Sequence, residues 1–437
     1  MRLPSLLALS LLAACDSSRP NPSPDPQVIA SVHTSAASIA VAMSASAQPP
    51  QTPVGMPASA TKLARSSNAL GFDLWRKMPA TGDAAMSPTS ISVALAMALG
   101  GAKGATAAQL AAAMHLDGAD PTAWGDISAA LENRGGELRI ANRLFAEKSY
   151  PFEEAFVRKT TASFRAPLDP VDFRTGSAAA RTHINSWVAD QTKHRIVELL
   201  GEGSVTPDTR LTLVNAIYLL ADWDVPFEKD ATFGEAFHLA SGETKQTPTM
   251  HRTESMRSGA ANGARIVDLP YKGSSLSMTV IVPDRVDGLA AIEASLSNAS
   301  LGQLDKALTT QRTAVSLPKF TIDPAASLSL SSALRALGVS DAFDVRTADF
   351  TGIARPAANG EKLVLSDVVH KAFVKIDEKG TEAAAATAVI AIAATGIAIE
   401  APPFEVKADR PFLFLIRDKT TGLVLFLGRV ADPKSGV

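Results

Sequence analysis

The stretch that decides the fold of this chain reads Glu378-Lys379-Gly380-Thr381-Glu382 and continues as Ala383-Ala384-Ala385-Ala386-Thr387-Ala388-Val389-Ile390-Ala391-Ile392-Ala393-Ala394-Thr395-Gly396-Ile397-Ala398-Ile399. From Ala383 to Ile399 there is no charge and no proline, and nearly every side chain is small or β-branched. A membrane helix needs about 20 strongly apolar residues, whereas this run has 17, mostly alanine. The alanines favour helix and the β-branched residues favour strand, so local propensity leaves both conformations open.

As a strand, this segment has one face without any large or charged side chain. Alternate residues of a strand point to opposite sides. One side would carry Thr381, Ala383, Ala385, Thr387, Val389 and Ala391, and the other Glu382, Ala384, Ala386, Ala388, Ile390 and Ile392. The segment is therefore suited to enter between two existing strands.

The residues from Glu378 to Thr387 resemble the hinge of the reactive-centre loop of serpins, in its inhibitory form. The matching positions are Glu378, Gly380, Thr381, Glu382, Ala383, Ala384, Ala385, Ala386 and Thr387. The resemblance implies an α+β chain with the serpin fold, in which mixed central β-sheets are surrounded by about eight or nine helices. It also implies an exposed reactive-centre loop at about residues 378–403, with Thr381 exposed until the loop inserts.

Further motifs extend the resemblance along the chain. The segment from Met86 to Met97, with Gly101 to Thr106 after it, resembles the part of serpins that forms the shutter under the central sheet. The resemblance assigns Ser87, Ser90, Asn215 and His370 to this shutter, and Trp223 to the breach, where the loop first enters.

Two positions depart from the family pattern. The asparagine usually found a few residues before the shutter serines is absent, which leaves Asp83 as the nearest polar candidate. The usual glycine between Asn215 and Trp223 is also missing, and Ala221-Asp222 stand in that stretch.

Hydrophobic periodicity and turn residues predict an alternation of helices and strands. We expect helices from about Thr61, from Met86 to Met97, from Ala180 to Leu200 and from about Ser327 to Leu337. We expect strands at Ile140–Phe145, Leu211–Leu219, Leu276–Pro283 and Val368–Asp377, and a hairpin of Arg410–Asp418 with Leu423–Val430. These motifs follow serpin order over one domain, residues 61–437, without an internal repeat.

The composition narrows the function classes. The chain has 437 residues, of which 46% are hydrophobic and 20% charged, and its 42 basic residues nearly balance 44 acidic ones. Nothing here favours nucleic-acid binding, and nothing predicts an oligomer, so we expect a monomer. A single cysteine excludes an intrachain disulfide and a multi-cysteine metal site, and we expect neither a metal site nor a cofactor.

The N-terminal residues resemble a bacterial lipoprotein signal. Met1-Arg2 and the apolar run Leu3 to Ala14 have the pattern of a secretory signal. The ending Leu12-Ala13-Ala14-Cys15 resembles a lipobox, which implies lipidation of Cys15 and removal of the residues before it; an ordinary signal peptide with a chance cysteine is the alternative. We expect an extracytoplasmic protein anchored to a bacterial membrane, at the periplasmic face or cell surface, through a disordered Pro/Ser/Ala-rich tether at residues 16–60.

No enzymatic motif is present. HExxH, GxSxG, GxxxxGK and CxxC are all missing, and the seven histidines are scattered. We expect no catalytic residue, and we interpret His370 as a hydrogen-bonded core histidine.

The resemblance implies suicide inhibition of serine, or possibly cysteine, proteases. The family register places the cut between Ala394 and Thr395, although Ala393, Thr395 or Ile397 remain open as the residue before the cut. The small side chains before the cut fit a shallow S1 pocket, so we expect an elastase-like or subtilisin-like partner. The alternative is a non-inhibitory serpin-fold protein that binds or chaperones, which a charged or bulky residue on the inward face of the hinge would favour.

Overall fold

The computed structural model describes residues 55–133, 137–357, 359–381 and 401–434. Within these ranges the chain forms nine α-helices and three short 3₁₀ helices around β-sheets, so the predicted α+β architecture is confirmed. The α-helices are α1 (Ala60–Trp75), α2 (Pro88–Leu99), α3 (Gly104–Ala113), α4 (Trp124–Glu132), α5 (Glu154–Phe164), α6 (Phe173–Gln191), α7 (Leu289–Ser295), α8 (Asn298–Ala307) and α9 (Ser331–Ala336). The 3₁₀ helices are η1 (Pro121–Ala123), η2 (Lys229–Ala231) and η3 (Asp341–Phe343).

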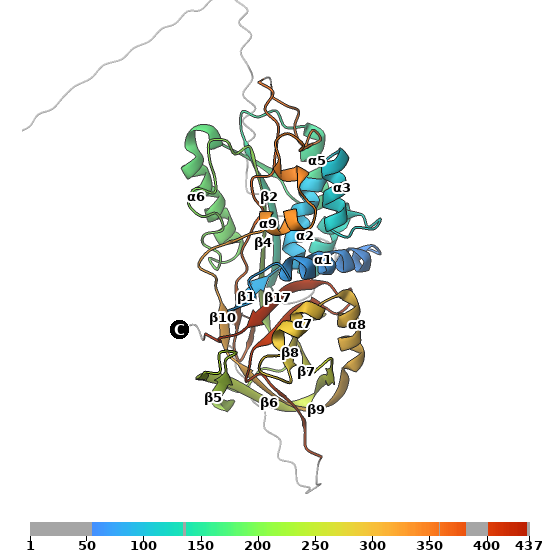
Figure 1. The fold of residues 1–437 in the computed structure, drawn as a ribbon, viewed down its shortest axis with the longest axis vertical. Coiled ribbons are helices and arrows are strands. Elements are labelled where there is room, and N and C mark those ends of the chain that lie inside the picture. Colours follow the sequence, from blue (N-terminus) through green and yellow to red (C-terminus); the bar gives the residue numbers. More distant parts are fainter. Residues whose placement is uncertain (1–54, 134–136, 358, 382–400, 435–437) are drawn as a thin grey trace, which may run out of the picture. The chain divides into compact units, whose positions relative to one another are not determined.

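The larger sheet has nine strands in the order β1-β17-β16-β8-β7-β6-β9-β15, with β5 paired to β6. Its strands are β1 (Ala84–Met86), β5 (Thr232–His238), β6 (Thr244–Ala261), β7 (Ala264–Pro270), β8 (Leu276–Pro283), β9 (Thr309–Pro318), β15 (Phe404–Lys407), β16 (Phe412–Asp418) and β17 (Val424–Val430). Residues far apart in the sequence therefore become neighbours: β16 and β17, near the C-terminus, lie between β1 and β8 (Figure 1).

The second sheet carries the candidate site. It has six strands in the order β10-β13-β14-β4-β2-β3, and a two-stranded sheet pairs β11 with β12. The strands are β2 (Glu137–Glu147), β3 (Leu168–Val171), β4 (Leu211–Asp222), β10 (Phe320–Ile322), β11 (Leu328–Ser329), β12 (Val369–His370), β13 (Val374–Ile376) and β14 (Gly380–Thr381). Helices α6 and α2 contact β4 and lie on opposite sides of it (Figure 1).

The predicted hairpin near the C-terminus is confirmed, and it lies in the core. Every residue of β16 and β17 is buried, as expected for strands covered on both faces. Asp418 closes the turn, because its carboxylate accepts the backbone N–H of Thr421 at 2.9 Å and the Thr421 hydroxyl at 2.6 Å.

Helix α2 begins at Pro88, two residues after the predicted start at Met86. Ser87 is the N-cap, and its hydroxyl oxygen accepts the backbone N–H of Ser90 at 3.1 Å. Pro88 takes the first helical position, where its missing N–H costs nothing. The first helix likewise starts at Ala60, beside the predicted start at Thr61.

Three predicted elements differ from the structure. The helix predicted to reach Leu200 ends at Gln191, because Lys193 and His194 adopt left-handed conformations with φ of 48° and 59°. Residues near Ser327 pair as β11 with β12, so α9 starts later than expected. The single strand predicted over Val368–Asp377 is divided into β12 and β13.

No helix within the described residues is both long enough and apolar enough to cross a membrane.

Candidate functional site

The beginning of the predicted hinge is already a strand of the six-stranded sheet. After β13 the chain reverses at Asp377–Lys379, and β14 returns between β13 and β4. Thr381 pairs with Ile376 of β13 and with Ala221 of β4, while Gly380 pairs with Asp222. The chain thus enters the sheet at the position that the sequence assigned to the breach.

Gly380 permits this entry by its lack of a side chain. A Cβ at this position would lie 2.0 Å from the carbonyl oxygen of Ala221 and 2.8 Å from the Cα of Asp222. Real Cβ atoms do not approach backbone so closely. Glycine is therefore required for β14 to fit against β4.

Glu378 is fixed at the reversal by a neighbouring cation. Its carboxylate lies 2.9 Å from Nζ of Lys319, and its carbonyl oxygen accepts the N–H of Phe227 at 2.8 Å. Burial raises the pKa of Glu378, but the Lys319 hydrogen bond and charge, together with further hydrogen bonds, outweigh this effect and hold the pKa below its ordinary value. The carboxylate is ionised at neutral pH.

Thr381 is buried rather than exposed, which contradicts the expectation from the sequence. It is 4% exposed, and its hydroxyl lies 2.6 Å from the hydroxyl of Tyr271. Burial raises the pKa of Tyr271 far above its ordinary value, although the Thr381 hydrogen bond opposes this, so the phenol stays protonated. The physical reason for the error is that two rungs of backbone pairing and this buried hydrogen bond are available without cleavage of the loop.

Trp223 lies at the breach, as the resemblance implied. Its indole Nε1 donates to the carbonyl oxygen of Asp377 at 3.0 Å, and its backbone N–H donates to Lys379 at 2.6 Å. The indole stacks on Tyr271 with ring centroids 4.8 Å apart. Trp223 and Tyr271 therefore hold both sides of the reversal that leads into β14.

The shutter residues are only partly brought together. Nε2 of His370 accepts the backbone N–H of Ser87 at 2.9 Å. Burial lowers the pKa of His370 to about 4, so the ring is neutral. The interpretation of His370 as a hydrogen-bonded core histidine is confirmed, and Ser90 joins the same group through Ser87.

Asn215 and Asp83 do not have the partners that the sequence suggested. The amide of Asn215 donates to Oδ1 of Asn142 at 2.5 Å, and in the described part of the chain its own Oδ1 has no hydrogen-bond partner. Asp83 accepts the N–H groups of Ala431 and Asp432 at the end of β17. Asp83 does not replace the missing asparagine, because β1 pairs with β17 and carries Asp83 toward that strand.

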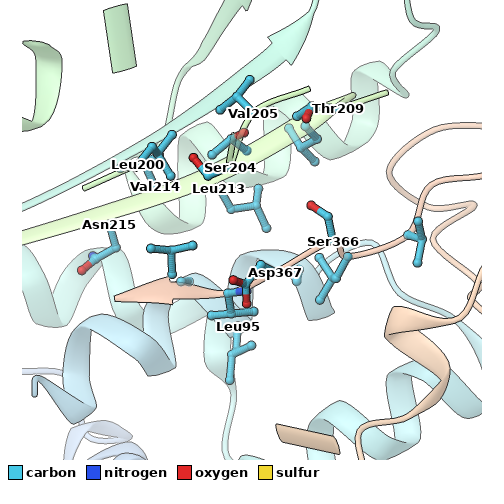
Figure 2. A pocket seen from close by; sticks show the side chains of 18 of the residues that line it. Leu95, Leu200, Ser204, Val205, Thr209, Leu213, Val214, Asn215, Ser366 and Asp367 are labelled. Carbon is cyan, nitrogen blue, oxygen red and sulfur yellow. The ribbon is translucent and has the colours of Figure 1, made fainter. Parts of the chain in front are cut away.

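Beyond β14, the described residues leave a slot between β4 and the next segment of the sheet. Among the described residues, β4 pairs with β14 only at Ala221 and Asp222, and from Leu211 to Leu220 it has its backbone partner in β2 alone. The opposite bank of the slot is formed by residues 363–369. A cavity of about 90 Å³ lies between the banks, and Figure 2 shows Leu213 and Asn215 on one bank with Ser366 and Asp367 on the other.

The slot is covered on both faces of the sheet. On the inner face, α2 contributes Ser90, Ala94, Leu95 and Ala98 to the cavity lining. On the outer face, Leu199, Leu200 and Val205 follow α6 and belong to a second apolar cluster with Phe145, Phe173, Ile184, Val188 and Val214. The cavity is therefore mainly apolar, with the unpaired Oδ1 of Asn215 at its edge.

Asn185 holds this outer cover in place. Its Oδ1 accepts the N–H groups of Leu199 at 3.1 Å and Leu200 at 2.8 Å, and its Nδ2 donates to the Leu200 carbonyl oxygen at 2.9 Å. Asn185, Lys319 and Tyr271 were not identified as site residues from the sequence. Their partners lie on other elements, so no local pattern marks them.

Several predicted residues lie outside the described part of the chain. These are Cys15, the tether before residue 55, the hinge residues Glu382, Ala383, Ala384, Ala385, Ala386 and Thr387, and the predicted cut residues Ala394 and Thr395. Among the residues that the structure does describe, no cluster of three or more His, Cys, Asp or Glu side chains is arranged to hold a metal ion.

Comparisons with known proteins agree with this arrangement. The family model described as "Serpin (serine protease inhibitor)" matches residues 65–433. The chain is 39% identical over 365 residues to leukocyte elastase inhibitor A of Rattus norvegicus, covering 81% of this chain and 94% of that protein. It is 38% identical over 364 residues to leukocyte elastase inhibitor of Homo sapiens, covering 80% of this chain and 93% of that protein. The solved structure "Cleaved Serpin 42Da" has a TM-score of 0.76 and 29% identity, covering 86% of this chain and all of that one.

Proposed function

This chain belongs to the serpin family, and from that premise we propose that it is a suicide inhibitor of serine proteases, not an enzyme. A protease cuts the loop after Ala394 and remains attached to it as the acyl-enzyme. The freed hinge then inserts into the six-stranded sheet and carries the attached protease with it. Distortion of the protease active site by a small displacement is sufficient to stop deacylation.

One observation carries the proposal: β14 has entered the sheet, while no other described strand pairs with β4 ahead of it. Gly380 and Thr381 occupy the first two positions between β13 and β4. On the side of β4 where β14 pairs, no strand lies beside Leu211 to Leu220 among the described residues; β2 pairs with the other side. The sheet is thus prepared to receive a continuation of β14.

The register of β14 identifies which residues would fill the slot. Because β14 is antiparallel to both neighbours, each further residue would face the preceding residue of β4 and of β13. Continued without a bulge, this register sets Ala391 opposite Leu211 and Ala394 opposite Asp208. The inward face would then be Ala383, Ala385, Thr387, Val389 and Ala391, whose small or β-branched side chains suit the space above α2.

Insertion supplies the free energy for trapping. About a dozen new backbone hydrogen bonds at a net ~1 kcal/mol each, together with burial of the apolar side chains, supply on the order of 10 kcal/mol. The unpaired edge of β4 and the unpaired Oδ1 of Asn215 are the groups that gain partners. In this proposal the energy stays stored while the loop is intact and is released when cleavage frees the end of the hinge.

Small residues before the cut support an elastase-like target. Ile392-Ala393-Ala394 would fit a shallow S1 pocket and would leave the aspartate of a trypsin-like pocket unpaired. Relatives named leukocyte elastase inhibitor support the same protease class. We further propose that a lipid on Cys15 holds the monomeric protein at the outside of a bacterial membrane, with residues 16–60 as a tether.

The proposal is tested by mixing the protein with pancreatic elastase. We expect a complex that survives SDS, and we expect cleavage of the loop to raise the melting temperature strongly. Ala394→Arg should transfer inhibition from elastase to trypsin, because a small pocket excludes the guanidinium group and an acidic one pairs with it.

The result that overturns the proposal is cleavage without trapping. If elastase and subtilisin cut the loop and are released active, and the cleaved protein melts at the same temperature as the uncleaved one, the chain is a non-inhibitory binding protein. Sequencing of the released C-terminal peptide tests the cut site separately, since an N-terminus other than Thr395 shows that the register is wrong.

A further inference from the structure

A partly buried ion pair lies at the far end of the slot. Arg210 directly precedes β4, and Glu361 precedes the bank formed by residues 363–369. Nε of Arg210 donates to the carboxylate of Glu361, and the Arg210 side chain is only 8% exposed. Each residue belongs to a different bank, so this contact joins the two banks.

Both partners are held by their own bank. Nη1 of Arg210 donates to the carbonyl oxygens of Pro207 at 2.7 Å and Thr209 at 2.9 Å. The carbonyl oxygen of Glu361 accepts the N–H of Ala357 at 2.9 Å and the Tyr150 hydroxyl at 3.2 Å. If the two banks move apart, neither Arg210 nor Glu361 can stay in contact with the other unless it loses these hydrogen bonds.

Glu361 has a second, more exposed cationic partner. Nη2 of Arg174, in the first turn of α6, lies 3.4 Å from its carboxylate. Burial raises the pKa of Glu361, but the hydrogen bonds and charges of Arg210, Asn359 and Arg174 together outweigh it and hold the pKa below its ordinary value. The carboxylate is thus ionised and paired.

A second cavity, of about 570 Å³, surrounds this ion pair. It shares Thr209, Leu211, Leu363, Val364 and Ser366 with the lining of the slot cavity. The two cavities therefore lie next to each other along the edge of β4.

The register of β14 brings the last residues before the cut to this second cavity. Counting back along β4 from the Thr381–Ala221 pair, Ile392 would face Arg210 and Ala394 would face Asp208. Counting along the other bank from the Thr381–Ile376 pair, Ile392 would face Leu365 and Ala394 would face Leu363. Arg210, Asp208 and Leu363 line the second cavity, whereas Leu365 lines the slot cavity.

We propose that this cavity is the terminal seat for Ile392, Ala393 and Ala394, and that the Arg210–Glu361 pair keeps the seat closed until the loop is cleaved. The proposal rests on the proposed inhibitory function and describes its last step. Adjacent strands lie about 4.8 Å apart, so banks with a strand between them lie about 9.6 Å apart. The ion pair must open as these three residues enter.

Opening the pair delays the final movement of the attached protease. A buried ion pair that loses its contact leaves charges with poor solvation, which is costly. Because the protease is bonded to Ala394, its last displacement waits for this opening. Insertion competes with deacylation. The ion pair therefore affects the fraction of cleavage events after which the protease is released active.

Glu361→Gln in the full chain tests this proposal. We expect the melting temperature of the uncleaved protein to fall by about 5 °C, because the charge of Arg210 loses its partner. We expect the cleaved protein to melt as the wild type does, because the pair is already open there. With the inhibitor at a concentration that saturates elastase, the rate at which elastase activity is lost, measured by stopped flow, should be at least about threefold faster for the variant than for wild type.

Two other variants serve as controls. Glu154→Gln removes the same charge from Arg158 on the exposed surface of α5, and it should change none of these measurements. Arg210→Lys keeps a cation beside Glu361 and should lie between wild type and Glu361→Gln. If Glu361→Gln does not fold, Arg174→Gln is used in its place. It removes the second, more exposed cation beside the Glu361 carboxylate and should accelerate trapping to a smaller extent.

The outcomes separate this proposal from the inhibitory function. If wild-type protein forms no SDS-stable complex with elastase, the inhibitory function itself is wrong. If wild type traps elastase but Glu361→Gln lowers the melting temperatures of cleaved and uncleaved protein equally, the pair persists after insertion and the terminal seat is wrong. An unchanged trapping rate in both Glu361→Gln and Arg174→Gln also overturns it.

Discussion

At the scale of single residues, Gly380 controls the entry of the hinge. An added Cβ would collide with the carbonyl oxygen of Ala221, and the nearest atoms are all backbone of Ala221 and Asp222, so no flexible side chain can yield. Gly380→Ala should therefore expel β14, break the Thr381–Tyr271 hydrogen bond and destabilise the uncleaved fold by about 1–3 kcal/mol. It should also turn much of the inhibitor into substrate. Melting temperature and stoichiometry of elastase inhibition measure the two effects.

Gly302→Ala is the matched control for this prediction. Gly302 lies in α8, and a Cβ there would have no neighbour within 4 Å. The control should match or slightly exceed wild-type stability, since alanine favours helix over glycine. If Gly380→Ala has the melting temperature and the inhibition stoichiometry of wild type, the close approach of β14 to β4 contributes neither to stability nor to inhibition.

Residue-level predictions from sequence succeed where the partner is local or the environment is set by a motif. Pro88 in the first turn of α2 and His370 in the core are such cases. The pairs Lys319–Glu378 and Tyr271–Thr381 join separate strands, so no spacing rule reveals them. Burial of Thr381 depends on whether two rungs of pairing form before cleavage, which is a balance of free energies and not a pattern of residue types.

At the scale of elements, the contact between β12 and the start of α2 makes stability depend on pH. Folding lowers the pKa of His370 to about 4 from an ordinary value of 6.5. Between these values the unfolded chain binds more protons, so the folded protein loses stability as pH falls from about 6.5 toward 4, by up to about 1.4 kcal/mol per pH unit. His370→Gln keeps an acceptor for the Ser87 N–H and should flatten this decline in a melting-temperature series.

Carboxylates also titrate in this range, and the comparison of variants removes their contribution. Glu378 and Glu361 have lowered pKa values, so their stabilisation is lost as pH falls in both proteins. Only the difference between wild type and His370→Gln reports the histidine. Parallel curves from pH 7 to pH 5 would mean that His370 does not contribute.

Element boundaries show where pattern reading reaches its limit. The β16–β17 hairpin was predictable, because continuous apolar runs flank a polar turn. The end of α6 was not predictable, because Lys193 and His194 adopt left-handed conformations that are not expected from their residue types. The alternation over Val368–Asp377 is real, but β12 pairs with β11 and β13 with β10, so the strand divides between two sheets.

At the scale of the whole molecule, the proposed lipid anchor concerns where inhibition takes place. If Cys15 is lipidated, the mature chain is held at a membrane by a tether that ends near α1. Cys15→Ser should release the protein from the membrane fraction or block its processing, while the purified variant should inhibit elastase as wild type does. Cell fractionation and an elastase assay measure the two properties.

Mass spectrometry of the wild-type N-terminus is the direct check on this anchor. An acylated Cys15 as the first residue is the expected product. Unmodified Cys15, together with equal membrane partition of wild type and Cys15→Ser, would leave an ordinary secreted inhibitor.

The burial of β16 and β17 also affects how a cell must make this protein. The ribosome produces these strands last, yet they lie between β1 and β8 and complete the larger sheet. The strands that bound the slot, β4, β13 and β14, leave the ribosome earlier, so a nascent chain has a period in which the slot can fill before the larger sheet closes. Slow decoding of codons 412–430 should lengthen that period and increase the share of inactive product, which titration of freshly made protein with elastase would measure.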